Sequence, residues 1–159
     1  MKWAALAIVA ACGTPPPGLA PDSGACEPYV VPTSLDLSMP ARSFATDVMP
    51  VMTMHCASCH GSSVRSGGLF LGDTANDAAA VYKNLVGVPS AENASMDFVT
   101  ASDPARSFLM HKLDGDQCQY DAMCSGGTCQ HAMPMLGGQL TETERDAIRS
   151  WIYQGAMND

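Results

Sequence analysis

The chain has few aromatic residues, few basic residues and no long apolar run, and each shortage argues against a class of protein. Aromatic residues make up 6% of the 159 residues, so side chains alone offer little large apolar surface for the core of a small domain. Eight Lys and Arg face 16 Asp and Glu, giving a net charge of −8, which argues against nucleic acid as a partner. No apolar run reaches the ~18 residues that span a bilayer, so we expect no transmembrane helix.

Cysteine and methionine are plentiful instead, with 7 and 11 residues, and one cysteine cluster has a specific spacing. Residues 56–60 read Cys-Ala-Ser-Cys-His, and C-x-x-C-H is typical of covalent attachment of a c-type haem. The thiols of Cys56 and Cys59 can each add to a vinyl group on one edge of the porphyrin, and His60 is then placed as the proximal iron ligand. The motif therefore predicts one covalently bound haem c.

Two other chemistries use a C-x-x-C pair. A thioredoxin-like motif follows a strand in a βαβ pattern, and a structural zinc site needs a second Cys/His pair at suitable spacing. Neither context is convincing in this sequence. A large flat cofactor would also supply the apolar packing that the few aromatic side chains do not, so we expect haem to be part of the core.

The N-terminus is similar to the signal peptide of a bacterial lipoprotein. Lys2 gives a short positive region, residues 3–11 are apolar, and Val9-Ala10-Ala11-Cys12 resembles a lipobox. The resemblance implies a signal peptide over residues 1–11, cleavage before Cys12, and a lipid anchor on Cys12 that holds the protein at a bacterial envelope membrane, facing the periplasm. The leader is short, so an ordinary cleaved signal or a misplaced start codon is the alternative. Losing Lys2 changes the net charge from −8 to −8 − 1 = −9.

The next segment is predicted to be a flexible linker over residues 12–42. It is rich in Pro, Gly, Ser and other small residues, including three consecutive prolines, and such a composition buries too little apolar surface to offset the entropy of ordering. Local docking of Cys26, Tyr29, Val30 and Val31 on the domain is the exception we allow.

Residues 43–159 show the periodicity and capping signals of an all-α domain. The expected helices begin near Phe44, Asn76 or Asp77, Ser102 or Asp103, and Thr141, and they end near Cys56, Leu85, Leu113 and Gly155. The last begins with a Thr141/Glu144 capping box. Between the first two helices, a loop rich in glycine carries Leu69-Phe70-Leu71, which we expect to lie against the porphyrin edge.

Residues 43–157 together resemble the class I c-type cytochromes. Residues 47–50 and 55–61 are similar to that family's first helix and haem site, and residues 67–71 to its following loop. Residues 133–140, with Met133-Pro134 at their start, resemble the Met-Pro turn that precedes the family's last helix. The resemblance implies a small cytochrome c-like helical domain over residues 43–159, folded around one haem.

The resemblance also implies that Met133 binds the iron opposite His60. Reasoning from the residues alone leaves Met135 and His131 open as alternatives, because they lie on the same loop. We expect His55 at the surface, His111 in a structural role, and the remaining methionines as core filling. An iron held by imidazole and thioether has no open position, which favours electron transfer between redox-partner proteins over catalysis.

Four cysteines remain once Cys12, Cys56 and Cys59 are assigned: Cys26, Cys118, Cys124 and Cys129. In an exported protein an even remainder predicts two disulfides, for which three pairings are possible. A metal-binding or redox-sensing loop is the alternative. Two other function classes also stay open, namely a haem peroxidase or gas sensor with an open distal site, and a non-haem structural lipoprotein stabilised by disulfides.

Overall fold

The computed structural model describes residues 26–136 and 138–159. In these two ranges the chain forms helices and short helical turns with two isolated β-bridges and no β-strand, which confirms the all-α prediction. The segment predicted as a signal peptide, the predicted anchor residue Cys12 and the first part of the predicted linker fall outside the described residues. The elements in chain order are η1 (Phe44–Val48), α1 (Met49–His55), α2 (Ala57–His60), η2 (Ser66–Gly68), η3 (Ala75–Asp77), α3 (Ala78–Leu85), η4 (Pro104–Arg106), α4 (Phe108–Asp114), η5 (Gln117–Met123), η6 (Ser125–Gly127) and α5 (Glu142–Tyr153).

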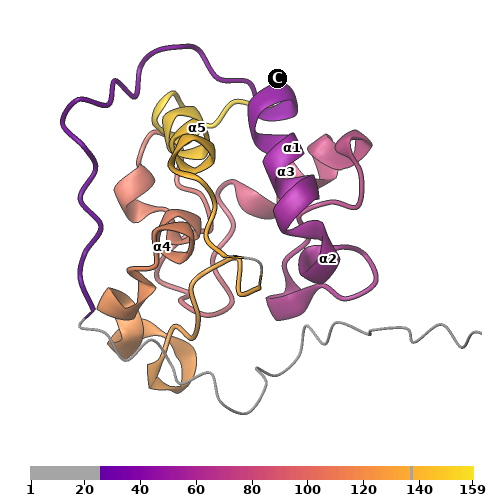
Figure 1. Cartoon of the computed structure of the whole chain (residues 1–159). Coiled ribbons are helices and arrows are strands. Elements are labelled where there is room, and N and C mark those ends of the chain that lie inside the picture. The colour runs from indigo at the N-terminus through magenta and orange to yellow at the C-terminus, as the bar shows by residue number, and fades with distance from the viewer. Residues whose placement is uncertain (1–25, 137) are drawn as a thin grey trace, which may run out of the picture.

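The first helical segment, η1 with α1, forms where the apolar spacing predicts it. Ser43 caps its start by accepting a hydrogen bond from Thr46 N, and the residues at helical spacing, Phe44, Val48, Val51 and Met52, are buried. The Phe44 ring lies 4.9 Å from the Trp151 ring of α5 and 5.7 Å from the Tyr82 ring of α3. The first segment therefore packs against both later helices, which places the following C-x-x-C-H residues at the end of a well-anchored element (Figure 1).

The last helix, α5, begins at the predicted capping box. Thr141 Oγ1 accepts from Glu144 N at 3.3 Å, and Glu144 Oε2 accepts from Thr141 N at 2.9 Å. The predicted apolar face, Ala147, Ile148, Trp151 and Ile152, is buried. The helix ends at Tyr153, and Gly155 follows with a φ of +108°, a conformation that glycine adopts without a steric cost.

The helix expected from Asp103 to Leu113 is divided in two. Asp103 caps the short turn η4 as predicted, but Ser107 is extended and α4 begins only at Phe108. The first amides of α4 find partners outside the helix, because Phe108 N donates to Asp97 O and Leu109 N donates to Phe98 O, each at 2.9 Å. The neighbouring loop thus satisfies groups that a continuous helix would have paired internally.

The start of α3 (Ala78–Leu85) also differs from the prediction. The helix ends at Leu85 as predicted, with Val81 and Leu85 buried. Asp77 stands at its N-cap position but makes no side-chain capping bond there; the capping box is formed by Thr74 and Asp77 one turn earlier, at the start of η3.

Residues 26–42, which we call the N-terminal strap, lie against the domain rather than forming the flexible linker expected there. Cys26 is disulfide-bonded to Cys118. Further along, Gln154 donates to Leu37 O and Pro40 O and accepts from Arg42 N. Figure 1 shows the strap in indigo, passing along the side of the molecule that carries α4 and α5. Of the four residues expected to dock locally, Cys26 and Tyr29 contact the domain and Val30 is exposed, and further contacts at Leu37, Pro40 and Arg42 hold the other end of the strap.

Candidate functional site

A cavity of about 660 Å³ opens between the C-x-x-C-H residues and the loop that carries Met133. Its volume falls within the ~300–1,000 Å³ of ordinary ligand and cofactor pockets. Much of its wall is apolar and comes from three parts of the chain: Leu69, Leu71, Phe98, Phe108, Leu109 and Leu113. Cys56, Cys59, His60 and Met133 all line it, so the fold brings the four predicted site residues to one cavity.

The proximal residues lie at the junction of α1 and α2. The amides of Cys59 and His60 both donate to Cys56 O, at 3.1 and 2.8 Å, which winds the C-x-x-C-H residues into a compact turn. Leu71 N donates to His60 O at 2.7 Å and folds the glycine-rich loop back over the motif. A side chain at Gly61 would collide with the Asp73 side chain and the Ala57 carbonyl, so the return of the loop requires glycine there.

The loop residues Leu69, Phe70 and Leu71 are buried by the protein itself, and their contact with a porphyrin edge stays a prediction. Leu69 and Leu71 line the cavity. Phe70 is covered by the Arg65 guanidinium, 5.1 Å from the ring centre. The loop therefore supplies two apolar side chains to the proximal wall.

The two cysteines of the motif differ in state. Cys56 is a free thiol, and burial raises its pKa to about 12. Cys59 is disulfide-bonded. Attachment of haem requires both sulfurs as thiols, so the bond at Cys59 must be reduced before a thioether forms there.

His60 is suited to binding a metal ion. Its Nδ1 is buried without a hydrogen-bond partner. Burial lowers the pKa of the imidazole, and the nearby backbone of Leu69 and Ser66 raises it by less, so the net shift is downward. The ring is therefore neutral at pH 7, which leaves a nitrogen lone pair for a ligand bond.

The distal wall is formed by the segment that follows Cys129. Met133 is partly buried and packs against the main core, and its amide donates to Lys112 O at 2.7 Å. Met135 and His131 line the same cavity. All three candidates for the distal ligand thus lie at this wall, and Met133 is the one that the main core holds.

Sequence reasoning missed the role of His55, which it expected at the surface. Its side chain is 32% exposed, lines the cavity, and lies 2.9 Å from Glu144 Oε1 through Nε2. Glu144 also belongs to the capping box of α5. This contact joins the end of α1 to the start of α5 beside the cavity.

Lys112 and Glu92 are the other cavity residues that the sequence did not single out. Lys112 is only 6% exposed, and its Nζ lies 2.8 Å from Glu92 Oε2 and 2.7 Å from Cys129 O. Burial lowers the pKa of Lys112, and the Glu92 carboxylate opposes that shift. The available signal was a lysine between Phe108, Leu109 and Met110 on one side and Leu113 on the other, the four apolar residues of α4.

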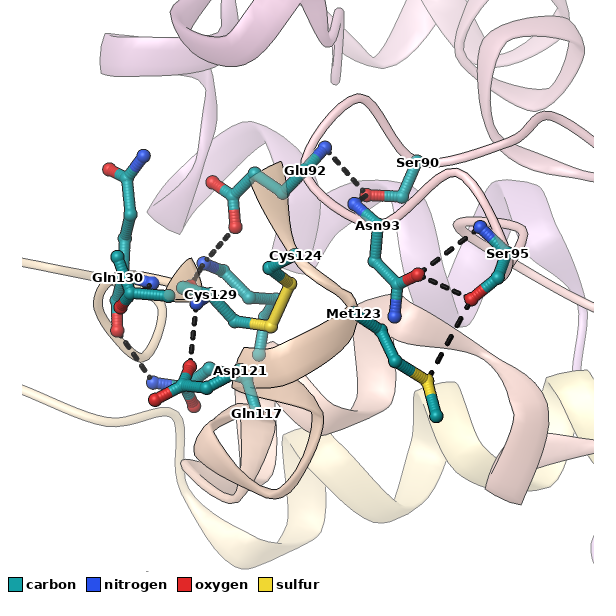
Figure 2. Close-up of a disulfide and its surroundings, with 12 residues drawn as sticks. Ser90, Glu92, Asn93, Ser95, Gln117, Asp121, Met123, Cys124, Cys129 and Gln130 are labelled. Atoms are coloured by element: carbon teal, nitrogen blue, oxygen red, sulfur yellow. Dashed lines mark hydrogen bonds and ion pairs between the residues drawn. A yellow bond between two sulfur atoms is a disulfide. The ribbon is translucent and has the colours of Figure 1, made fainter. Parts of the chain in front are cut away.

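The two predicted disulfides are present, and the structure settles their pairing as Cys26–Cys118 and Cys124–Cys129. Figure 2 shows the second, with Asp121 and Glu92 beside it. Cys129 N donates to Asp121 Oδ1 at 2.6 Å, so this small loop is held by both a covalent bond and a hydrogen bond just before the distal wall.

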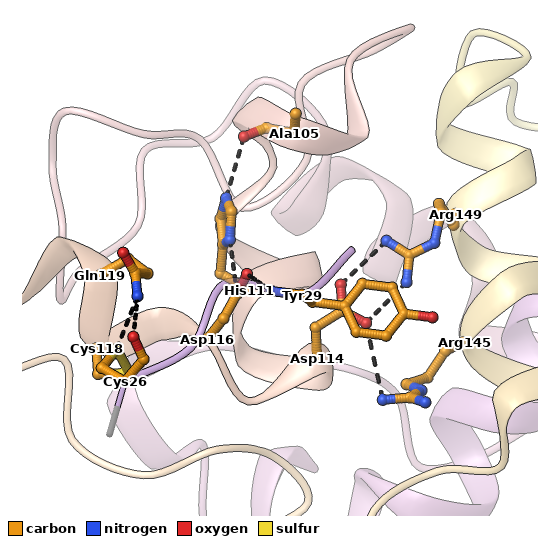
Figure 3. Close-up of polar contacts among 10 residues, drawn as sticks. All are labelled: Cys26, Tyr29, Ala105, His111, Asp114, Asp116, Cys118, Gln119, Arg145 and Arg149. Carbon is orange, nitrogen blue, oxygen red and sulfur yellow. Dashed lines mark hydrogen bonds and ion pairs between the residues drawn. A yellow bond between two sulfur atoms is a disulfide. The ribbon is translucent and has the colours of Figure 1, made fainter. Parts of the chain in front are cut away.

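The first disulfide fixes the strap next to a buried polar cluster (Figure 3). Tyr29 N donates to Asp116 Oδ2 at 2.9 Å. The other Asp116 oxygen lies 2.8 Å from His111 Nδ1, and His111 Nε2 lies 3.0 Å from Ala105 O. A carboxylate and a carbonyl only accept hydrogen bonds, so both ring nitrogens must donate, and this geometry requires a protonated imidazole.

We expect the protein to lose stability above neutral pH because of His111. Burial alone would lower its pKa, but the hydrogen bonds to Asp116 and Ala105 outweigh burial and raise it. A raised folded-state pKa contributes stability that is complete below the unfolded value of about 6.5 and is lost as the pH rises through the folded value. Urea unfolding from pH 6 to pH 9 measures this loss, and His111→Gln should remove the His111-dependent part of the slope. Equal slopes in the two proteins would contradict the assignment.

Comparisons with protein families, with curated proteins and with solved structures find no match to this chain. Within residues 26–136 and 138–159, no group of three or more His, Cys, Asp or Glu side chains is placed to hold a metal ion. Over the same residues, none of the helices has both the length and the apolar character needed to cross a membrane. The resemblance to class I cytochromes therefore rests on the motifs of the chain itself.

Proposed function

We propose that this chain is a monohaem c-type cytochrome that passes single electrons between redox-partner proteins. The observation that carries the proposal is the convergence of Cys56, Cys59, His60 and Met133 on one cavity of about 660 Å³ with largely apolar walls. In the sequence, 73 positions separate His60 from Met133 (133 − 60 = 73), so their convergence is a property of the fold.

The residues of the cavity fit haem c. Cys56 and Cys59 would hold it by thioether bonds, His60 and Met133 would hold its iron, and the porphyrin supplies the other four iron ligands, so a cluster of three protein ligands is not needed. The bound group supplies the one-electron chemistry. The chain's own residues bind and orient it and exclude water with the apolar walls, and we propose no catalytic residue.

The protein's charge favours partners of opposite sign. With a net charge of −8 over the whole chain, a redox partner with a basic face would be attracted and oriented at long range. We also propose that the protein works in the bacterial envelope, facing the periplasm, as a lipoprotein anchored through Cys12. Disulfides fit an oxidising compartment of this kind.

One observation favours a second candidate, a non-haem structural lipoprotein stabilised by disulfides. Cys59 is disulfide-bonded, so five of the six cysteines in the described ranges are in disulfides, and Cys56 is free. A disulfide-bonded Cys59 is not a thiol, so its sulfur does not add to a vinyl group. This candidate is colourless, so absorption separates it from the first.

The test is a reduced-minus-oxidised absorption spectrum of the protein exported together with the c-type maturation machinery. We expect sharp ferrous bands and the weak long-wavelength ferric band that reports a methionine–iron bond. Met133→Ala should keep the covalent haem, lose the long-wavelength band and lower the reduction potential, because a thioether favours ferrous iron. Met54→Ala is the matched control, since Met54 is 77% exposed on α1.

Each other outcome has a distinct meaning. A colourless protein would overturn the cytochrome proposal in favour of the structural lipoprotein. Haem without the long-wavelength band in the wild type would favour an open distal site, as in a peroxidase or gas sensor. Loss of the band in Met135→Ala, but not in Met133→Ala, would move the ligand to Met135, whereas a wild type without the band whose haem spectrum changes in His131→Ala would assign the ligand to His131.

A further inference from the structure

Lys112 makes two backbone contacts that bracket the segment leading to Met133. Its Nζ donates to Cys129 O at 2.7 Å, and its own carbonyl accepts from Met133 N at 2.7 Å. The two contacted residues are the first and last of the five-residue segment 129–133. One residue of α4 thus fixes both ends of the chain that presents Met133 to the cavity.

Burying the charged side chain of Lys112 costs free energy, and the two polar partners that offset this cost also fix its position. The side chain is 6% exposed, so its ammonium group has lost most of its hydration. The Glu92 carboxylate at 2.8 Å and the Cys129 carbonyl replace the lost water contacts. The ammonium also lies 5.7 Å from the centre of the Phe108 ring. A buried charge with these partners has little freedom to move, so its contact with Cys129 is well defined.

The bracketed segment has few other supports. At its start, Cys129 is held by the disulfide to Cys124 and by Asp121. Within it, Gln130 O accepts from Gln117 Nε2 at 3.1 Å. Glu92 belongs to the same assembly, because its carbonyl accepts from Ser125 N at 2.8 Å, and Figure 2 shows it beside the disulfide. Lys112 is thus the residue that links α4, the Glu92 loop and the disulfide loop.

We propose that Lys112 is a positioning residue for Met133. By fixing both ends of segment 129–133, Lys112 places the Met133 thioether where it can bind the haem iron. This inference rests on the proposed function. The Lys112 side chain touches Cys129 and Glu92, not the iron, so its effect on ligation passes through segment 129–133.

Lys112→Met in the haem-loaded protein tests the proposal, since methionine keeps the length of the side chain and removes the charge. We expect covalent haem to be retained, the long-wavelength ferric band to weaken or vanish, and the reduction potential to fall. The imidazole concentration that displaces the distal ligand should drop by about tenfold or more, and exchange of the Met133 amide hydrogen should accelerate by a similar factor, the size of one lost hydrogen bond to a charged group.

Three variants keep the result interpretable. Lys83→Met is the matched control, because Lys83 is an exposed lysine on α3, and it should leave every readout unchanged. Lys112→Arg retains a donor cation and should restore most of the band. Glu92→Gln removes the charge that holds Lys112 while keeping an acceptor, so it should shift the same readouts in the same direction even if Lys112→Met does not fold.

The two proposals fail in different ways. A wild-type protein without haem would overturn the proposed function. Haem with an unchanged long-wavelength band, imidazole affinity and Met133 amide exchange in folded Lys112→Met or Glu92→Gln would overturn the role of Lys112 and leave the proposed function standing. Equal effects of Lys83→Met and Lys112→Met would also overturn it, because a general loss of positive charge would then explain both.

Discussion

Asp114→Ala is expected to lower the free energy of unfolding by about 3–5 kcal/mol, because it leaves a buried arginine without its counterion. The Asp114 carboxylate, 4% exposed, bonds Arg149 at two points, 2.7 and 3.0 Å, and Arg149 is 3% exposed. Arg145 lies 3.9 Å from the same carboxylate. The Tyr29 ring of the strap covers both guanidinium groups, at 4.8 and 5.2 Å (Figure 3). This cluster locks α4, which carries Lys112, onto α5.

Urea unfolding at pH 7 measures this loss, with Glu27→Ala, an exposed carboxylate of the strap, as the control. Burial raises the pKa of Asp114 and the ion pair with Arg149 opposes that shift, so the net contribution of the pair is smaller than the cost of breaking it. Asp114→Asn keeps the shape and a hydrogen-bond acceptor and should lose less than the alanine variant. A loss below about 1 kcal/mol in Asp114→Ala, the range of an exposed ion pair, would show that solvent reaches this cluster.

Removing the Cys26–Cys118 disulfide is expected to cost about 4–5 kcal/mol, roughly twice the cost of removing Cys124–Cys129. In the chain-entropy model the stabilisation grows with the loop that the bond closes, and the sequence separations are 92 and 5 residues. The double variants Cys26→Ser/Cys118→Ser and Cys124→Ser/Cys129→Ser allow the two bonds to be compared in the same protein. The measurement is the midpoint and slope of guanidinium unfolding.

The strap gives this prediction a second readout. Once the disulfide is absent, the strap is held by hydrogen bonds to Asp116 and Gln154 and by the Tyr29 ring. We therefore expect amide exchange to rise in residues 26–35 before it rises in α5. Equal losses of stability for the two double variants would contradict the entropic account and point to local contacts around each bond.

Part of the fold could be predicted because its signals are local. The face of the first helix, the Thr141/Glu144 capping box and the stop at Gly155 each depend on residues within a few positions of one another, and periodicity and capping act over that range. The even number of remaining cysteines likewise predicted two disulfides without reference to distance.

Other features depended on segments that are distant in the sequence. The late start of α4 at Phe108 follows from carbonyls of Asp97 and Phe98 that accept its first amides. The pairing of Cys26 with Cys118 follows from the path of the strap. No local pattern indicates either, because both depend on which distant groups the folded chain brings within bonding distance.

The sequence by itself determined the helical class, the C-x-x-C-H motif with Met133 as its distal candidate, and the fact that Cys26, Cys118, Cys124 and Cys129 form two disulfides. The tertiary structure alone decided that His60 and Met133 face one cavity, that His55 reaches Glu144, and that Lys112 is buried against Glu92 and Cys129. The physical reason is that residue type and short spacing fix local conformation, whereas burial of a charge and closure of a cavity arise only when remote segments exclude water together.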